Sequence, residues 1–87
     1  MKSTTELKAF KKFGPGYFVS EELRNQNLSK ARFSELTGIT NSELDDILKN
    51  KKPISVEMAS LLSKAFNKSP EYWLNIDSMY RLWLREK

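Results

Sequence analysis

The chain has 87 residues, of which 39% are hydrophobic and 11% aromatic, and its formal net charge is +4. That length limits it to one domain with a single modest core, the apolar fraction argues against disorder, and the positive charge suits a polyanionic partner only weakly. It contains neither cysteine nor histidine, which excludes disulfides and thiolate metal sites, removes the commonest general base, and suits a reducing cytoplasm.

The N-terminal segment, residues 1–13, contains few apolar side chains and four lysines. A Gly-Pro-Gly sequence follows at residues 14–16 and is typical of a break in regular structure. We therefore expect a flexible arm over residues 1–13, with at most one helical turn over residues 7–10, followed by a folded domain over residues 14–87.

The first helix of that domain is predicted to begin at Pro15 or Gly16, because the first turn is the position that tolerates proline. It runs to about residue 26. Its inward-facing residues are predicted to be Phe18, Val19 and Leu23.

The following stretch, residues 28–53, predicts two short helices joined by a glycine turn. Ser29 is a suitable N-cap for the first helix, and Gly38 supplies the left-handed residue that ends it. Thr40 opens the second helix, and Glu43 three residues later completes a capping-box pattern. The apolar positions of the pair are Phe33, Leu36, Ile39, Leu44, Ile47 and Leu48.

Asn50 can end the second helix of the pair in the left-handed region. A fourth helix is predicted over residues 56–66, with Ser55 as its N-cap, and a fifth over residues 70–85, with Ser69 as its N-cap and a proline at its first position. No strand-like alternation occurs, so the fold class is all-α with five helices. The expected apolar positions of the last two helices are Met58, Leu61, Leu62, Ala65, Tyr72, Trp73 and Ile76.

A helix-turn-helix pair of this kind presents the N-terminal residues of its second helix to base edges, while neighbouring basic groups hold phosphates. The candidates for base reading are Thr40, Asn41, Ser42, Glu43 and Asp46. The candidates for phosphate contact are Lys30, Arg32, Lys49, Lys51 and Lys52. The alternative, which the sequence leaves equally open, is that the two helices only pack on each other and the lysines solvate a surface. Glu43, Asp45 and Asp46 oppose the phosphates and predict weaker or more selective binding.

The fifth helix is rich in large apolar side chains. The first of them are expected in the core, but a domain this small cannot readily bury them all, and exposed aromatic patches mark interfaces. A membrane-surface helix is the minor alternative, because few cationic residues lie there. The residues assigned to a dimer contact are Met79, Tyr80, Trp83 and Leu84.

Signals for catalysis are nearly absent. The carboxylates lie on predicted helix surfaces, and neither a glycine-rich phosphate loop nor a metal-ligand spacing occurs. We therefore expect no enzyme activity, no metal and no cofactor. Because the N-terminus has no long apolar run, we expect no signal peptide, no membrane span and no membrane partner.

Two stretches carry a family resemblance: PGYFVSEELRNQNLSKARFSELTGIT and ILKNKKPISVEMASLLSKAFNKSPEYWLNIDSMYRLW. Over residues 14–83 the chain resembles HigA-type antitoxins, the antidotes of addiction modules, within the wider Xre/Cro-like family. The specific part combines K-x-P-I-S-x-E-M-A with S-P-E-Y-W-L-N. The resemblance implies a Cro/C1-like (lambda repressor-like) helix-turn-helix domain that forms a homodimer, represses its own promoter by binding double-stranded operator DNA, and neutralises a small basic RelE/HigB-like ribonuclease toxin.

By position, the resemblance places residues 40–43 on the family's base-reading stretch and Lys30 on its phosphate contact. Asp45 and Asp46 depart from the family, which commonly has non-acidic residues there, and Asn50 replaces the usual glycine. The candidates for toxin binding, in the basic arm beside the first helix, are Lys8, Phe10, Lys11, Lys12 and Phe13.

Two other functions stay open on the sequence. One is a protein-interaction module that kept the fold and lost DNA binding. The other is a stand-alone Cro-like transcriptional regulator without a toxin partner. With two copies paired through the fifth helix, a DNA-binding dimer would place its two reading helices about 34 Å apart.

Overall fold

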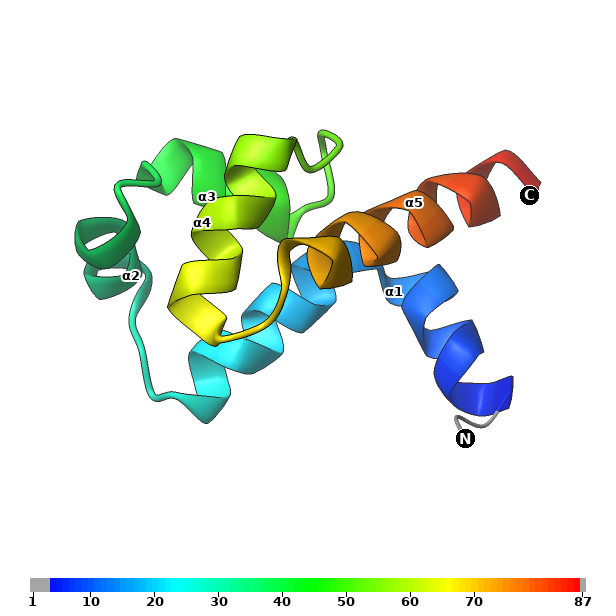
Figure 1. Ribbon diagram of the computed structural model, residues 1–87, viewed down its shortest axis with the longest axis horizontal. Coiled ribbons are helices and arrows are strands. Elements are labelled where there is room, and N and C mark those ends of the chain that lie inside the picture. The colour runs from blue at the N-terminus through cyan, green and yellow to red at the C-terminus, as the bar shows by residue number, and fades with distance from the viewer. Residues whose placement is uncertain (1–3, 87) are drawn as a thin grey trace.

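The computed structural model describes residues 4–86, with side chains from residue 13 onward, and this part of the chain is all-α without a strand. This confirms the fold class expected from the sequence. Two short helices occupy one end of the molecule, and the longer α5 crosses the rest (Figure 1). In chain order the helices are α1 Thr4–Asn25, α2 Lys30–Thr37, α3 Asn41–Leu48, α4 Val56–Phe66 and α5 Pro70–Glu86.

The helix starts follow the expected capping residues. Ser29 Oγ accepts from the backbone N–H of Arg32 at 3.1 Å, and Ser55 Oγ accepts from that of Met58 at 3.0 Å. Ser69 Oγ accepts in the same way from the third residue of α5, at 3.2 Å. Each side chain satisfies a donor that the first turn of a helix leaves unpaired. The predicted starts of α2, α4 and α5 are therefore confirmed.

The first helix differs from the sequence expectation. Its backbone is helical from residue 4, where a flexible arm with at most one turn was expected, and it bends at Gly14 (φ 71°, ψ 177°). Pro15 then begins the second part, as predicted, because a proline is tolerated where a first turn needs no donor. The dark blue first part turns away from the cyan second part (Figure 1). The toxin-binding candidates at positions 8–12 lie on the first part, and their side chains are outside the described ones.

The core is formed by one apolar face from each helix. Val19, Phe33, Leu44, Leu62 and Trp73 have no exposed surface. Burying a side chain of this kind contributes about 1.5–3 kcal/mol relative to leaving it in water. Two ring contacts connect α2, α4 and α5, with centroid distances of 5.2 Å for Phe33–Phe66 and 5.8 Å for Phe66–Trp73.

Leu36 is the exception to the predicted apolar pattern, because 60% of its surface is exposed. It lies one residue before the end of α2, at the border of a groove that Leu28 and Leu61 also line. α2 has only eight residues, and Phe33 is its buried residue, so the last turn of the helix stays outside the core.

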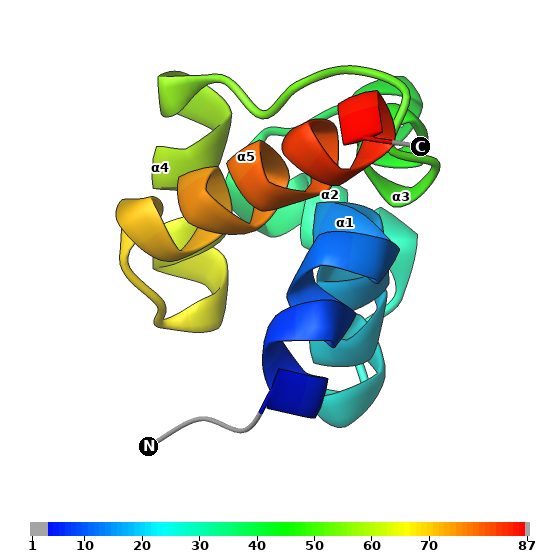
Figure 2. The ribbon, with the colours of Figure 1, turned by 90° about the vertical axis from the view of Figure 1, so that its right-hand side faces the viewer.

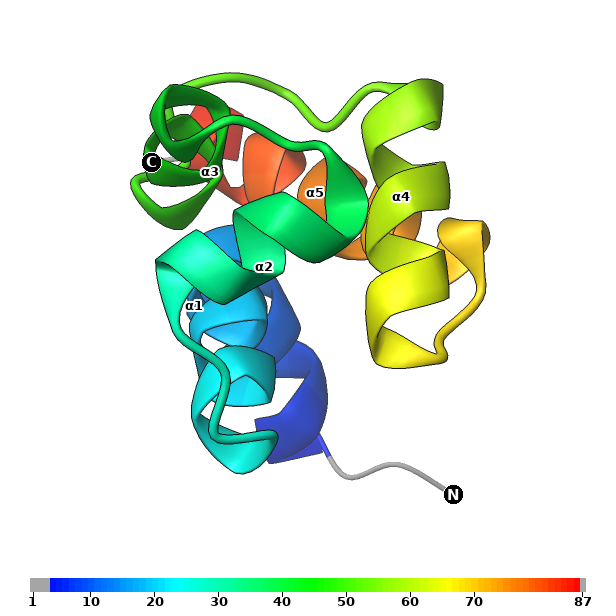
Figure 3. The ribbon, with the colours of Figure 1, turned by 90° about the vertical axis from the view of Figure 1, so that its left-hand side faces the viewer.

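α5 holds the two ends of the fold together. It packs against both α1 and α4, and Figure 2 shows it lying across them. On the opposite side, α2 lies between α3 and α4 and contacts both (Figure 3). α3 contacts α1 and α2, and its first three residues, 41–43, are exposed.

Candidate nucleic-acid interface

The turn between α2 and α3 is fixed by hydrogen bonds and by one buried side chain. Gly38 ends α2 in the left-handed region, at φ 81°, where a side chain would be strained. Ile39 follows with 1% exposure. Its backbone N–H donates to Thr37 Oγ1 at 3.1 Å, and Ser34 Oγ donates to its carbonyl. The angle between the two helices is therefore set by residues of the turn itself.

The N-terminus of α3 is exposed and carries the expected capping box. Thr40 Oγ1 accepts from the backbone N–H of Glu43 at 3.1 Å, and Glu43 Oε1 accepts from that of Thr40 at 2.9 Å. Both of these side chains are therefore occupied by the cap. Asn41 and Ser42 are also exposed, and their side chains form no hydrogen bond with the described part of the chain. Among residues 40–43 these two are the ones available to base edges.

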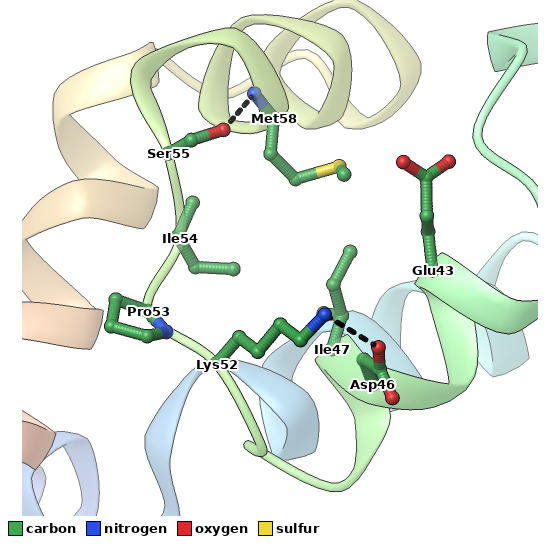
Figure 4. Close-up of a pocket in the computed structure, with 8 residues that line it drawn as sticks. All are labelled: Glu43, Asp46, Ile47, Lys52, Pro53, Ile54, Ser55 and Met58. Atoms are coloured by element: carbon green, nitrogen blue, oxygen red, sulfur yellow. Dashed lines mark hydrogen bonds and ion pairs between the residues drawn. The ribbon is translucent and has the colours of Figure 1, made fainter.

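Two of the three acidic residues of α3, Asp45 and Asp46, are paired with predicted phosphate-contacting lysines. Lys30 Nζ, from α2, lies 2.8 Å from Asp45 Oδ1. Lys52 Nζ, from the loop after α3, lies 3.6 Å from Asp46 Oδ2 (Figure 4). The hydrogen bond from Lys30 and then its charge hold the pKa of the Asp45 carboxyl below its ordinary value.

The other three phosphate candidates are exposed as well. Arg32 pairs along its own helix with Glu35, with 3.3 Å between Nη1 and Oε1. Lys49 and Lys51 form no ion pair with any described residue. The five basic residues thus border α3 from two elements, α2 on one side and the end of α3 with its following loop on the other.

A pocket of about 240 Å³ opens between α3 and the start of α4. Its lining is partly apolar, and its charged residues are Glu43, Asp46 and Lys52 (Figure 4). The pocket could not be predicted from the sequence, because its two walls come from separate helices. The remaining lining residues are Ile47, Pro53, Ile54, Ser55 and Met58.

Asn50 joins the end of α3 to the first and last helices. Its φ of 56° confirms the left-handed conformation predicted for it. Its Oδ1 accepts from the backbone N–H of Gly16 at 2.8 Å, and its Nδ2 donates to the carbonyl of Phe13 at 3.3 Å. Its own carbonyl accepts from Arg81 Nη1 at 3.2 Å. The sequence identified this residue only as a helix end and not as a junction.

Asp77 is a second residue with a structural role that was not predicted from the sequence. It is 6% exposed and accepts from the backbone N–H of Ile54 at 3.1 Å and from Arg81 Nε at 3.3 Å. The loop that carries Lys51 and Lys52 is therefore attached to α5 at both of its ends. The spacing of four residues between Asp77 and Arg81 was a readable signal for an ion pair on one helix face.

The predicted dimer residues lie at the outer end of α5. Met79, Tyr80 and Trp83 are half-buried, and 39% of Leu84 is exposed. Part of the Tyr80 ring is already covered within the chain, because it packs closely against Gly14. Nearby on α1, Phe13 stacks on Tyr17 with 4.7 Å between ring centroids, and both rings are more than 40% exposed. Apolar surface is thus available on both α1 and α5.

No helix within residues 4–86 combines the length and apolar character needed to cross a membrane. Among the described side chains, no three acidic residues gather closely enough to hold a metal ion.

A sequence model of the helix-turn-helix family matches residues 20–73. The chain is 33% identical over 69 residues to virulence-associated protein A' of Dichelobacter nodosus, covering 78% of this chain and 60% of that protein. It is 33% identical over 73 residues to the uncharacterised HTH-type transcriptional regulator YddM of Escherichia coli, covering 84% and 78%. Its fold matches the Pseudomonas aeruginosa antitoxin HigA, solved with the higBA promoter, with a TM-score of 0.72 and 28% identity, covering 79% and 76%.

Proposed function

The chain belongs to the helix-turn-helix family, in the antitoxin-like group of DNA-binding regulators, and from this premise we propose that it is the antitoxin of a type II toxin–antitoxin system. In this proposal, two copies pair through α5 and bind operator DNA in their own promoter. The protein also binds and neutralises a small basic RelE-like ribonuclease toxin. It has no catalytic role of its own.

The observation that carries the DNA-binding part is the exposed start of α3 between two groups of basic side chains. Asn41 and Ser42 have their polar groups unoccupied, and an asparagine matches the donor and acceptor pattern of an adenine edge. Lys49 and Lys51 are exposed cations that form no ion pair in the described chain, although the charge of Lys49 also acts on Asp45, so they can contact phosphates without breaking an ion pair. Base reading and phosphate binding are then supplied by adjacent parts of one surface.

The experiment is a fluorescence-anisotropy titration with two duplexes, the DNA upstream of the protein's own gene and a shuffled duplex of equal composition. We expect tighter binding to the upstream DNA. Asn41→Ala should weaken that binding by about 1–3 kcal/mol and reduce the preference for it. Lys51→Ala should instead weaken binding to both duplexes equally. Equal losses on both duplexes with Asn41→Ala would rule out a base-reading role for Asn41.

Two alternatives predict different results. A protein-interaction module that lost DNA binding is favoured by the ion pairs that occupy Lys30 and Lys52, and it predicts no binding to either duplex at low salt. A stand-alone regulator is favoured by the likeness to YddM, whose name records a transcriptional regulator. It predicts upstream DNA binding without a toxin partner. Capture of a small basic protein encoded beside the gene would support the antitoxin and contradict the stand-alone regulator.

A further inference from the structure

Asp45 and Asp46 are consecutive residues of α3, yet their side chains reach lysines of two different elements. Neighbouring residues on an α-helix point about 100° apart. Asp45 therefore reaches Lys30 of α2, at 2.8 Å, and Asp46 reaches Lys52 of the following loop, at 3.6 Å. Each lysine is therefore paired with α3, the helix that is proposed to enter the major groove of DNA.

These are exchangeable pairs, because their members stay in contact with water. The Lys30 side chain is 55% exposed and the Lys52 side chain 76% exposed. Exposed ion pairs are weak, so a DNA phosphate can replace the carboxylate. The replacement nevertheless breaks one charge-assisted contact for each one that it forms. It also leaves an unpaired carboxylate beside the phosphate backbone, which adds repulsion.

We propose that Asp45 and Asp46 compete with DNA phosphates for Lys30 and Lys52 and thereby lower the affinity for DNA of any sequence. The inference rests on the proposed DNA-binding function and assigns a role to two residues that otherwise oppose it. Base contacts by Asn41 and Ser42 do not involve these lysines, so the competition does not reduce what those contacts contribute to the affinity. The protein then depends more on base contacts, and less on phosphate contacts, to stay bound.

The pairing distinguishes these lysines from the other basic residues. Arg32 pairs with Glu35 along α2, away from α3, so that pair does not link it to the proposed reading helix. Lys49 and Lys51 form no ion pair with any described residue, although the charge of Lys49 also helps to lower the pKa of the Asp45 carboxyl. The competition therefore acts mainly on Lys30 and Lys52, and it predicts that most of the effect of each aspartate requires its own lysine.

The test measures binding of a random-sequence duplex by Asp45→Asn and Asp46→Asn. Each variant should bind about two- to fivefold more tightly than the wild type, as expected for the release of one exposed pair. Glu71→Gln is the matched control, because it makes the same change of charge at an exposed position in the first turn of α5. A gain no larger than that of Glu71→Gln would overturn the proposal.

A double-mutant cycle separates competition from direct repulsion. In a Lys30→Met background, Asp45→Asn should gain clearly less affinity than it gains in the wild type, because no lysine is left to release. The same holds for Asp46→Asn with Lys52→Met. Undiminished gains in these backgrounds would show that the aspartates repel DNA directly and would overturn the proposal. Circular dichroism and thermal unfolding verify that each variant is folded.

The outcomes for the two proposals are distinguishable. If the wild type prefers upstream DNA but the aspartate variants behave like Glu71→Gln, the competition is wrong and the proposed function stands. If the wild type shows no preference but the aspartate variants gain lysine-dependent affinity, the competition stands and the proposed function fails. If no variant binds DNA at low salt, both fail.

Discussion

The backbone N–H of Gly16 donates a hydrogen bond of 2.8 Å to Oδ1 of Asn50, which fixes the second part of α1 against the end of α3. The two backbones approach so closely that a Cβ on Gly16 would lie 2.4 Å from the carbonyl oxygen of Leu48. A side chain at position 16 therefore requires the two helices to separate. The position of α3, and with it the proposed reading surface, depends on this contact.

Gly16→Ala should lower the free energy of unfolding by about 1–3 kcal/mol, the usual range for overpacking in a core. The loss would be measured by urea denaturation followed by circular dichroism. Ser20→Ala is the control, because Ser20 is an exposed position later in the same helix and should change stability by less than about 0.5 kcal/mol. Equal stability of the two variants would contradict the close approach.

Substitutions at Asn50 separate the backbone effect from the side-chain effect. Asn50→Gly accommodates the φ of 56° but leaves the Gly16 N–H without its acceptor, a loss of about 1–3 kcal/mol. Asn50→Ala loses the same hydrogen bond and adds left-handed strain, about 1 kcal/mol more. Thermal and urea unfolding would measure both.

The control for this pair is Asn67→Gly. Asn67 has the same φ of 56°, but its side chain makes no hydrogen bond within the described chain. Glycine there should be neutral or slightly stabilising. If Asn50→Gly were equally neutral, the side chain of Asn50 would not hold α1.

Asp77→Asn should loosen the loop after α3, because it removes the charge that pairs with Arg81 and weakens the acceptor for the Ile54 N–H. Breaking one side of a buried pair leaves the other charge uncompensated, and we expect a loss of about 1–3 kcal/mol. Hydrogen exchange gives the sharper measurement: the Ile54 amide should exchange faster than in the wild type. Glu35→Gln, at an exposed pair on α2, should leave that amide unchanged.

The carboxyl of Asp45 should titrate below its ordinary range, because Lys30 donates to it and carries the opposite charge. A pKa lower in the folded than in the unfolded chain means that the pair stabilises the fold above the unfolded-state pKa. That contribution is lost as the pH falls through the folded-state pKa. Titration of the carboxyl carbon by NMR measures this directly. Lys30→Met should move the pKa back toward its ordinary value, and an unchanged pKa would contradict the ion pair.

Leu84→Glu tests the proposed pairing of two copies through α5. Leu84 is 39% exposed at the outer end of that helix, and a buried, unpaired carboxylate at an interface is strongly unfavourable. The variant should sediment as a monomer at concentrations where the wild type is a dimer. Leu36→Glu is the control, because Leu36 is 60% exposed on α2. If Leu36→Glu dissociated the dimer and Leu84→Glu did not, the interface would lie on α2 and not on α5.

Much of the fold could be predicted from the sequence because it depends on local residues. The caps at Ser29, Thr40 and Ser55 each act on a backbone group within three positions, so a short window of sequence contains both partners. The same is true of the left-handed end at Gly38. The structure differs from the local expectation before Gly14: α1 extends back to residue 4 and bends at Gly14, where a break was expected to end regular structure.

The sequence by itself thus determined the five-helix fold and the capped starts of α2, α3, α4 and α5. Only the tertiary structure decided that Lys30 meets Asp45, 15 positions away, and that Asn50 meets Gly16, 34 positions away. The physical reason is that capping and helical periodicity act along the chain, whereas these contacts depend on how the helices pack. Because of that packing, Asp45 and Asp46 form ion pairs with Lys30 and Lys52, whereas the sequence alone predicted only that they would oppose DNA phosphates.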